Sequence, residues 1–414
     1  TVRSADLMWA EARAHLDGRV GLAGDRRLEL AFSANQLEVP SLLKAIKRES
    51  LPLSGTLSAT GTLGGTLARP TARLNAQGAN LVAYEEAIGS LVADVNMADR
   101  EVQVSRLDID KPQPDGNGRV AATGTYHLDT RRYTADVKSE NVRLLGLQLS
   151  DGQGVRGTVQ LVAHASGTID APEGQAHLVV DSLELDRTTT VELAPLTIDA
   201  VAANKHATIN AVSDRFKLDA EALVALAKPW PTTVKVRADN LDLASLPLEG
   251  APPLEGQLRA TVEASGDLSE PERGQGTMAL ESFSGSWNGE PFAVTSASDL
   301  RYADERLTIE RLEVKSNESV LAVSGALPLT DRAGEGALML DLKANLAAAN
   351  HFIPRDVNIA TDGALTLTGS LKGTLKAIDP DLVVTVENGL ILSPELAPGF
   401  SKITMRARID NGEA

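Results

Sequence analysis

The feature that most constrains this fold is the alternation of apolar and hydroxylic residues along the chain. Residues 53–67 read LSGTLSATGTLGGTL, with leucine, alanine and glycine at the odd positions and serine or threonine at nearly all the even ones. Successive side chains of a β-strand point to opposite faces, whereas a helix would spread both classes around its surface. The stretch therefore predicts a strand with one apolar and one polar face.

The same phrase recurs at 155–172, 254–271 and 361–380, and the apolar parity persists while the polar residues change. In each copy nine residues separate two glycines, and a proline follows the second glycine by five or seven residues. The glycine pairs are Gly55 and Gly65, Gly157 and Gly167, Gly256 and Gly266, and Gly363 and Gly373. A repeat of about 100 residues predicts an array of similar units.

The repeat sets the expected division of the chain. We expect residues 1–52 to be the end of a preceding repeat with a short helix, 53–154, 155–253 and 254–360 to be repeats one to three, and 361–414 to be a truncated fourth. Because the chain begins at Thr1 without a methionine or signal peptide and stops within the pattern, we expect an internal fragment of a longer protein.

Turn signals divide each repeat into an antiparallel meander of short strands. Residues 98–100 and 303–305 are predicted hairpin tips, and about 11 residues per strand and turn predict roughly 35–40 strands. Each repeat closes on a segment expected to form a short helix or irregular turn; these segments are 36–50, 141–149, 240–250 and 345–356. Periodicity leaves residues 219–227 open between helix and strand.

Composition excludes several classes of function. The chain has no cysteine, which removes disulfides and thiolate metal sites, and its net charge of −16 argues against nucleic acid. Aromatic residues make up only 3% of the chain, so leucine, valine, isoleucine and alanine must build the apolar faces. No run of about 18 apolar residues is present, so no transmembrane helix is predicted.

Short motifs with a chemical meaning are better explained as structure. Residues 152–157 match G-x-G-x-x-G, but the third glycine opens an alternating strand, whereas a dinucleotide site needs a helix there. The six histidines show no metal-ligand spacing, and His164 lies on the polar parity, where we expect it to be solvated. Asp108 and Asp110 share a strand face and are expected to be solvated in an acidic protein.

Two further features allow a structural and a functional interpretation. Phe283, Trp287 and Phe292 form the densest aromatic cluster, which fits a packed hairpin better than a ligand patch. Asn317 begins a glycosylation sequon, which matters only if the source organism glycosylates. No group of residues suggests catalysis, a cofactor or a metal, so we do not expect an enzyme.

The continuous apolar face is the remaining candidate site. It must be covered by a second sheet, or by the sheet folding over itself, and an incomplete fold-over would leave a long apolar groove. Glycines on the inner parity favour a curved sheet, because they would leave gaps in a closed sandwich. The predicted groove residues are Leu57, Leu63, Leu67, Val102, Val104, Leu107, Ile109, Val159, Leu161, Leu258, Val262, Leu307, Ile309, Leu312, Val314, Leu365 and Leu367.

The pattern L-x-G-x-L-x-A…G-x-L-x-x-P, followed by a meander and a closing N-L-x-L-x-x-L, resembles the repeats of the TamB family, within the AsmA-like envelope proteins. The resemblance covers nearly the whole chain. It implies an all-β fold, an elongated repetitive antiparallel sheet rolled lengthwise into a trough (a β-taco) with short inter-repeat helices. It also implies a periplasmic location, with attachment to the inner membrane through a segment absent from this chain.

The function implied by the resemblance is a bridge that carries phospholipid acyl chains between the inner and outer membranes. The alternatives are a scaffold for outer-membrane protein assembly and secretion, in a translocation and assembly module with an Omp85-type barrel partner, or a structural stalk. A bridge predicts an open apolar lumen, a stalk predicts an interdigitated core, and a scaffold predicts a sheet edge that can pair with a strand.

Overall fold

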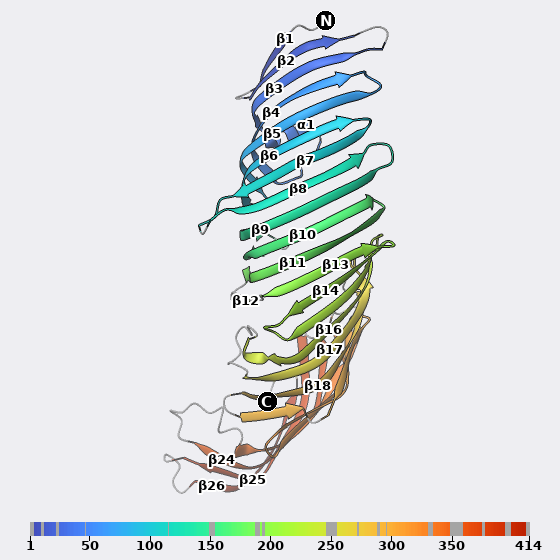
Figure 1. The fold of residues 1–414 in the computed structure, drawn as a ribbon. Coiled ribbons are helices and arrows are strands. Elements are labelled where there is room, and N and C mark those ends of the chain that lie inside the picture. The colour runs from blue at the N-terminus through green and yellow to red at the C-terminus, as the bar shows by residue number, and fades with distance from the viewer. Residues whose placement is uncertain are drawn as a thin grey trace. The chain divides into compact units, whose positions relative to one another are not determined.

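The computed structural model contains an α-helix, a short 3-10 helix and strands β1 to β26, and it confirms an all-β fold built as a repetitive antiparallel sheet (Figure 1). The chain divides into two compact units, Thr1–Ser213 and Asp214–Ala414, each considered by itself below. The residues described are 4–9, 12–21, 25–45, 47–114, 116–148, 154–186, 191–192, 195–245, 255–270, 273–287, 290–294, 296–329, 334–347, 359–374, 377–393 and 399–410.

In the first unit the strands pair antiparallel in chain order, so that each hairpin adds to the edge left by the one before. The short β12 bonds to the end of β11, and β13 continues the ladder beside β11. The strands are β1 (Ser4–Trp9), β2 (Ala12–Val20), β3 (Leu28–Glu38), β4 (Leu53–Gly65), β5 (Pro70–Ala83), β6 (Glu86–Ala98), β7 (Glu101–Lys111), β8 (Gly118–His127), β9 (Arg132–Gln148), β10 (Gly154–Thr168), β11 (Ala171–Asp186), β12 (Val191–Glu192), β13 (Leu196–Ala203) and β14 (His206–Ser213).

The second unit follows the same rule, except that β19 and β20 together fill the place of one strand between β18 and β21. Its strands are β15 (Leu218–Ala225), β16 (Pro231–Asp242), β17 (Glu255–Asp267), β18 (Gln275–Trp287), β19 (Glu290–Val294), β20 (Ser298–Ala303), β21 (Arg306–Ser316), β22 (Ser319–Pro328), β23 (Ala337–Asn345), β24 (Ala360–Thr374), β25 (Ala377–Leu392) and β26 (Phe400–Asp410).

The strands are longer than the sequence analysis predicted. Strand β9 has 17 residues and β11 has 16, so the estimate of roughly 35–40 strands was wrong, because 11 residues were allowed for a strand and its turn together. Both predicted hairpin tips are confirmed: Asp99 and Arg100 join β6 to β7, and Asp304 and Glu305 join β20 to β21. Residues 218–225 form strand β15, which resolves the ambiguous segment.

The predicted inter-repeat helices are found at two of the four segments. Helix α1 (Val39–Ala45) lies between β3 and β4, and the 3-10 helix η1 (Leu243–Ser245) follows β16. The prediction for 141–149 was wrong, since residues up to Gln148 belong to β9 and pair with β10. Most of the fourth segment, 348–356, lies outside the described residues.

The first glycine of the repeated phrase lies where an ordinary side chain would not fit. Gly55 has φ +119° beside a shift in the β4–β5 register, and a Cβ there would lie 2.8 Å from the Asn80 carbonyl oxygen. Gly363 has φ +124° at a similar shift between β24 and β25. Such bulges turn a strand locally and require a residue that tolerates positive φ.

The repeats and the compact units divide the chain differently. The boundary between Ser213 and Asp214 falls inside the second expected repeat. Strands on either side of an expected repeat boundary are paired, as β9 is with β10, β16 with β17, and β23 with β24. The equivalent strands still carry equivalent residues: β4 and β17 open with the glycine phrase, and β7 and β21 follow the two predicted tips. Each repeat is thus a length of one sheet rather than a separate core.

Candidate functional site

Strand pairing joins the apolar residues of the first unit into continuous rows across the sheet. Directly opposed residues of neighbouring strands share a face, so a row can be followed from partner to partner. The central row, as we name it, is Ala14, Ala34, Ala59, Ala76, Ala93, Leu107, Ala122, Val137, Ala163, Ala176, Ala200 and Ile209. At about 4.8 Å per strand this row is about 50 Å long and contains no polar side chain.

A flanking row of larger side chains runs beside the central row on the same face. Ser139 is its one polar member. The flanking row is Leu37, Leu57, Gly78, Leu91, Ile109, Val120, Ser139, Leu161, Leu178, Ile198 and Ala211. The face therefore has mainly small residues in its central row and larger, branched residues in most positions of its flanking row.

The predicted groove residues of the first unit can now be placed. Leu107 belongs to the central row and Leu57, Ile109 and Leu161 to the flanking row. Four more share this face in adjoining rows; they are Leu63, Val102, Val104 and Val159. Leu67 differs, because it follows the end of β4 in a turn and is 54% exposed.

In the second unit the remaining predicted residues also share one face. Val262 and Ile309 belong to a row that reads Ala220, Val236, Val262, Met278, Leu300, Ile309, Gly325, Leu338 and Leu371. Three parallel rows on the same face extend to β25. The first contains Leu312, the second contains Val314 and Leu367, and the third contains Leu365. Leu258 lies between Leu241 and Phe283, and Leu307 between Tyr302 and Leu327.

A hollow of ≈ 400 Å³ lies on the apolar face of the second unit. Apolar side chains from five strands line it, Val234, Val262, Met278, Leu300 and Leu307, and polar residues such as Thr232, Asp267 and Gln275 complete the lining. Val262 is 37% exposed within it. The hollow is therefore an apolar surface that water reaches, which is the property an alkyl-chain site requires.

The apolar face of the first unit is only partly covered. Every strand of this unit belongs to one sheet, so no second sheet packs on the face within the described ranges. Leu107, Ile109 and Leu161 are half-buried, whereas Leu327 of the second unit is 2% exposed and shows what full burial looks like. These three side chains are therefore partly open to solvent, whereas Ala34 and Ala93 of the central row are buried, at 7% and 8% exposed.

Helix α1 covers one part of this face. Its Val39 and Leu43 pack against the buried Leu81 and the half-buried Leu57 and Leu91. The helix lies behind the strands in Figure 1, so that view looks onto the opposite face of the sheet. Because α1 sits at one end of β4–β6, it narrows the apolar face there without closing it over the later strands.

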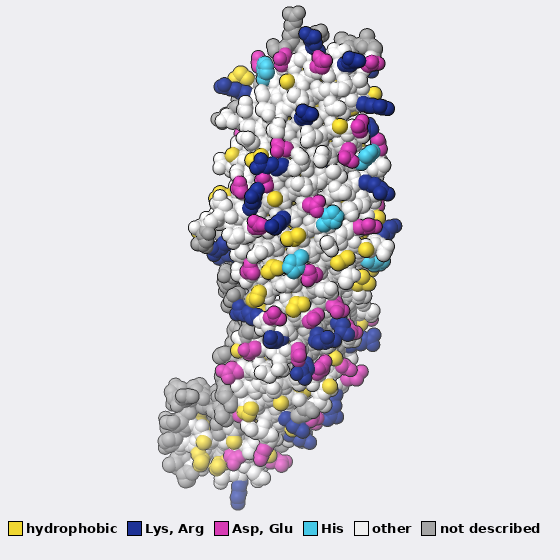
Figure 2. All heavy atoms as spheres, viewed as in Figure 1, with side chains coloured by type: hydrophobic (Ala, Val, Ile, Leu, Met, Phe, Trp, Pro, Cys, Tyr) yellow, Lys and Arg dark blue, Asp and Glu magenta, His cyan; other side chains and the backbone are white. Residues whose placement is uncertain are grey.

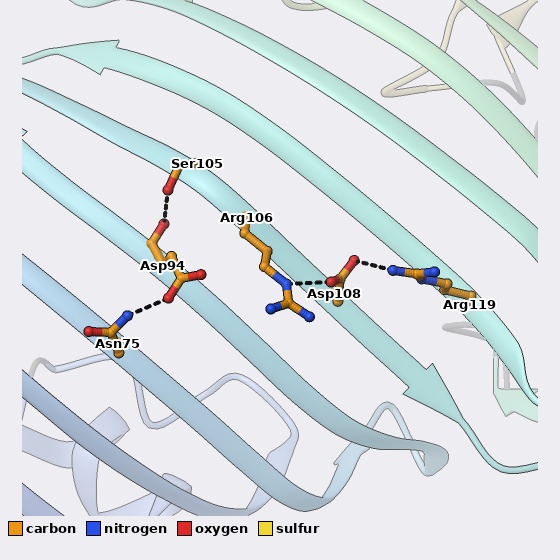
Figure 3. Close-up of polar contacts among 6 residues, drawn as sticks. All are labelled: Asn75, Asp94, Ser105, Arg106, Asp108 and Arg119. Carbon is orange, nitrogen blue, oxygen red and sulfur yellow. Dashed lines mark hydrogen bonds and ion pairs between the residues drawn. The ribbon is translucent and has the colours of Figure 1, made fainter.

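The opposite face of the first unit is polar. Figure 2 shows acidic, basic and histidine side chains distributed over it. In Figure 3, Arg106 Nε and Arg119 Nη2 both donate to the Asp108 carboxylate, at 2.6 and 3.2 Å, and Asn75 bonds to Asp94 on the neighbouring strand. The hydrogen bond from Arg106, then that from Arg119, lowers the pKa of Asp108.

The other motifs from the sequence resolve as structural. His164 Nδ1 lies 2.7 Å from Asp136 Oδ1 in a half-exposed cross-strand pair. The expectation that Asp108 is solvated was wrong, because Asp108 is 9% exposed and is held by two arginines, whereas Asp110 is exposed. Among the described residues no group of three or more potential ligands could hold a metal ion. Phe283 and Phe292 pack with ring centroids 5.1 Å apart across the β18–β19 hairpin. Trp287's side chain and Gly152 lie outside what is described.

Sequence reasoning missed a buried carboxylate that recurs after equivalent hairpins. Glu86 opens β6 and pairs with Lys111 Nζ, and both side chains are more than nine-tenths buried. Glu290 opens β19, where it accepts hydrogen bonds from Ser316 Oγ and from the Asn317 side-chain amide, at 2.5 and 2.8 Å. The sequon asparagine is thus already engaged. The signal available in the sequence was a glutamate on the apolar parity directly after a turn.

A scan against family models and searches of curated proteins and of solved structures each found no significant match. No helix within the described ranges is long and apolar enough to cross a membrane.

Proposed function

We propose that the apolar face holds phospholipid acyl chains and that this chain is a segment of a lipid-transport bridge between two membranes. The observation that carries the proposal is the pairing of apolar residues into rows that cross many consecutive strands without a facing layer. By the resemblance described above, such a bridge would be periplasmic and anchored in the inner membrane outside this chain.

The energetics suit transport more than storage. An alkyl chain on this face gains roughly 0.8 kcal/mol per buried CH₂ relative to water, but almost nothing relative to a bilayer. A lipid can therefore enter and leave without a deep energetic trap. No covalent step is needed, so the function requires neither a catalytic group nor a cofactor.

The test is to purify the chain and identify co-purified phospholipid by mass spectrometry. Leu107→Asp and Leu312→Asp each place a charge on the apolar face and should remove most of the bound lipid, because burying a carboxylate beside alkyl chains is costly. Gln103→Asp is the matched control: it adds the same charge to β7 on the polar face, where Gln103 is exposed. Equal lipid loss in Gln103→Asp, or no lipid in the parent chain, contradicts the proposal.

A second candidate is supported by one observation. Among the described residues β26 is paired on one side only, with β25, and most of its side chains are exposed. Such an edge can accept a strand, as a scaffold for outer-membrane protein assembly with an Omp85-type barrel would require. Proline at Thr404, which would remove a backbone N–H from this edge strand, should abolish strand capture but leave lipid binding intact.

A further inference from the structure

One end of the strands in the first unit carries a row of basic hairpin turns. Five of these turns contain a member of this row. They join β2 to β3, β4 to β5, β6 to β7, β8 to β9 and β13 to β14, and their basic residues are, in that order, Arg26, Arg69, Arg100, Arg131 and Lys205. All five are exposed. Since turns at one end recur every second strand, the first four members are about 10 Å apart, and Lys205 lies about 20 Å from Arg131 because the β10–β11 turn between them has no basic residue. We call this row the basic rim.

The basic rim places five exposed cations along one end of a unit in a chain whose net charge is −16. Acidic residues also occur in these turns; they are Asp25, Asp99, Asp129 and Asp170, with Glu101 opening β7. Asp129 is paired with Arg100, whose Nε lies 2.6 Å from it. Within the described residues no ion pair involves the other four cations, so they are available to an anion from outside the chain.

Backbone preference does not explain these residues. Arg26, Arg100, Arg131 and Lys205 have φ of +47°, +66°, +54° and +63°. Positive φ is strained for arginine and lysine, and glycine or asparagine is the usual choice in such turns. Four of the five basic-rim residues therefore occupy a backbone conformation that long side chains rarely adopt, as Tyr84 and Glu85 do in a turn at the opposite end.

The apolar face reaches the basic rim. Leu63 and Met97 lie close to the turns that carry Arg69 and Arg100, on the face of the central row. A ligand that contacts both features needs an alkyl part for the face and an anionic part for the rim. Phospholipids with a net negative headgroup have this form, with the phosphate oxygens accepting bonds from the guanidinium groups.

We infer that the basic rim recognises the phosphate headgroup of anionic phospholipids whose acyl chains lie on the apolar face. This inference rests on the proposed function and adds the headgroup class. At the opposite end the β5–β6 turn has Tyr84 and Glu85, and the exposed cations Lys47 and Arg48 lie in the single connection between β3 and β4 rather than in a row of turns.

The test is a competition between two lipids with identical dioleoyl chains, phosphatidylglycerol and phosphatidylcholine, supplied in equal amounts in detergent to the purified chain. Bound lipid is quantified by mass spectrometry. We expect phosphatidylglycerol to be enriched about fivefold, which is the contribution of one basic residue to binding an anionic lipid. Raising the salt concentration should reduce the enrichment.

The variant R26N/R69Q/R131N/K205N should lower the enrichment to about onefold while total bound lipid stays the same. Asparagine tolerates positive φ, so the variant keeps its turns. The matched control K47N/R48Q removes two exposed cations at the opposite end, Lys47 having φ +57°, and should keep the fivefold preference.

The outcomes separate the two ideas. Unchanged preference in the rim variant, or equal loss in the control, overturns the headgroup inference and leaves lipid binding standing. Absence of lipid from the parent chain overturns both. Competition by free glycerol 3-phosphate at similar concentration would assign the rim to soluble phosphate compounds and overturn its role in lipid recognition.

Discussion

The buried pair of Lys111 and Glu86 gives the sharpest prediction about stability. Lys111→Met keeps the stem of the side chain but removes the ammonium from a carboxylate whose side chain is 8% exposed. It also removes the hydrogen bond from Lys111 Nζ to the Ala87 carbonyl, at 2.8 Å. Breaking a buried ion pair from one side costs about 3–5 kcal/mol.

Hydrogen exchange is the suitable assay, because a sheet that grows strand by strand need not unfold in one step. In Lys111→Met, the protection of amides in β6 and β7 should fall at least about a hundredfold. The double variant Glu86→Gln with Lys111→Met removes both charges and should recover most of that protection. A change below about tenfold in Lys111→Met would refute the reasoning that this pair holds the two strands together.

Two further predictions concern single residues. Gly55→Ala should lower the free energy of local opening of β4 and β5, measured by hydrogen exchange, by more than about 1 kcal/mol, because it adds a contact with backbone to positive φ. Gly116→Ala, beside β8, has φ +120° but open space around its Cβ, so the same measurement there reports the backbone strain alone. The hydrogen bond from Arg106 lowers the folded-state pKa of Asp108, so its stabilisation is present above the unfolded pKa of about 3.9 and is lost as pH falls through the folded value. Asp108→Asn should remove that part of the acid sensitivity, and an unchanged profile would contradict the assignment.

Alternation predicted which residues of a strand share a face, because the side-chain period of a strand is fixed by its geometry. The prediction failed for Leu67, where the parity continues past the point at which the ladder ends. The expectation of a short helix at 141–149 was also wrong. Pairing with β10 extends β9 to Gln148, although the sequence of this segment was expected to form a helix or an irregular turn.

Other features depend on distant partners that one strand's sequence does not specify. Lys111 lies on the apolar parity and is buried only because Glu86 is brought beside it from 25 residues away. The rows of the apolar face likewise depend on register shifts, such as that between Val104 and Leu107, which keep equivalent residues opposed across a bulge. The extent of coverage by α1 was not predictable for the same reason.

The most direct measurement of the central claim uses two neighbouring residues of β8. Ala122 belongs to the central row, and Ala121 pairs with Asp108 and Lys138 on the polar face. A benzoylphenylalanine photo-crosslinker is placed at each site in turn, and the chain is loaded with phospholipid. The account predicts lipid adducts at position 122 and none at 121. Equal adducts at both, or adducts at neither, would contradict an open apolar face that carries acyl chains.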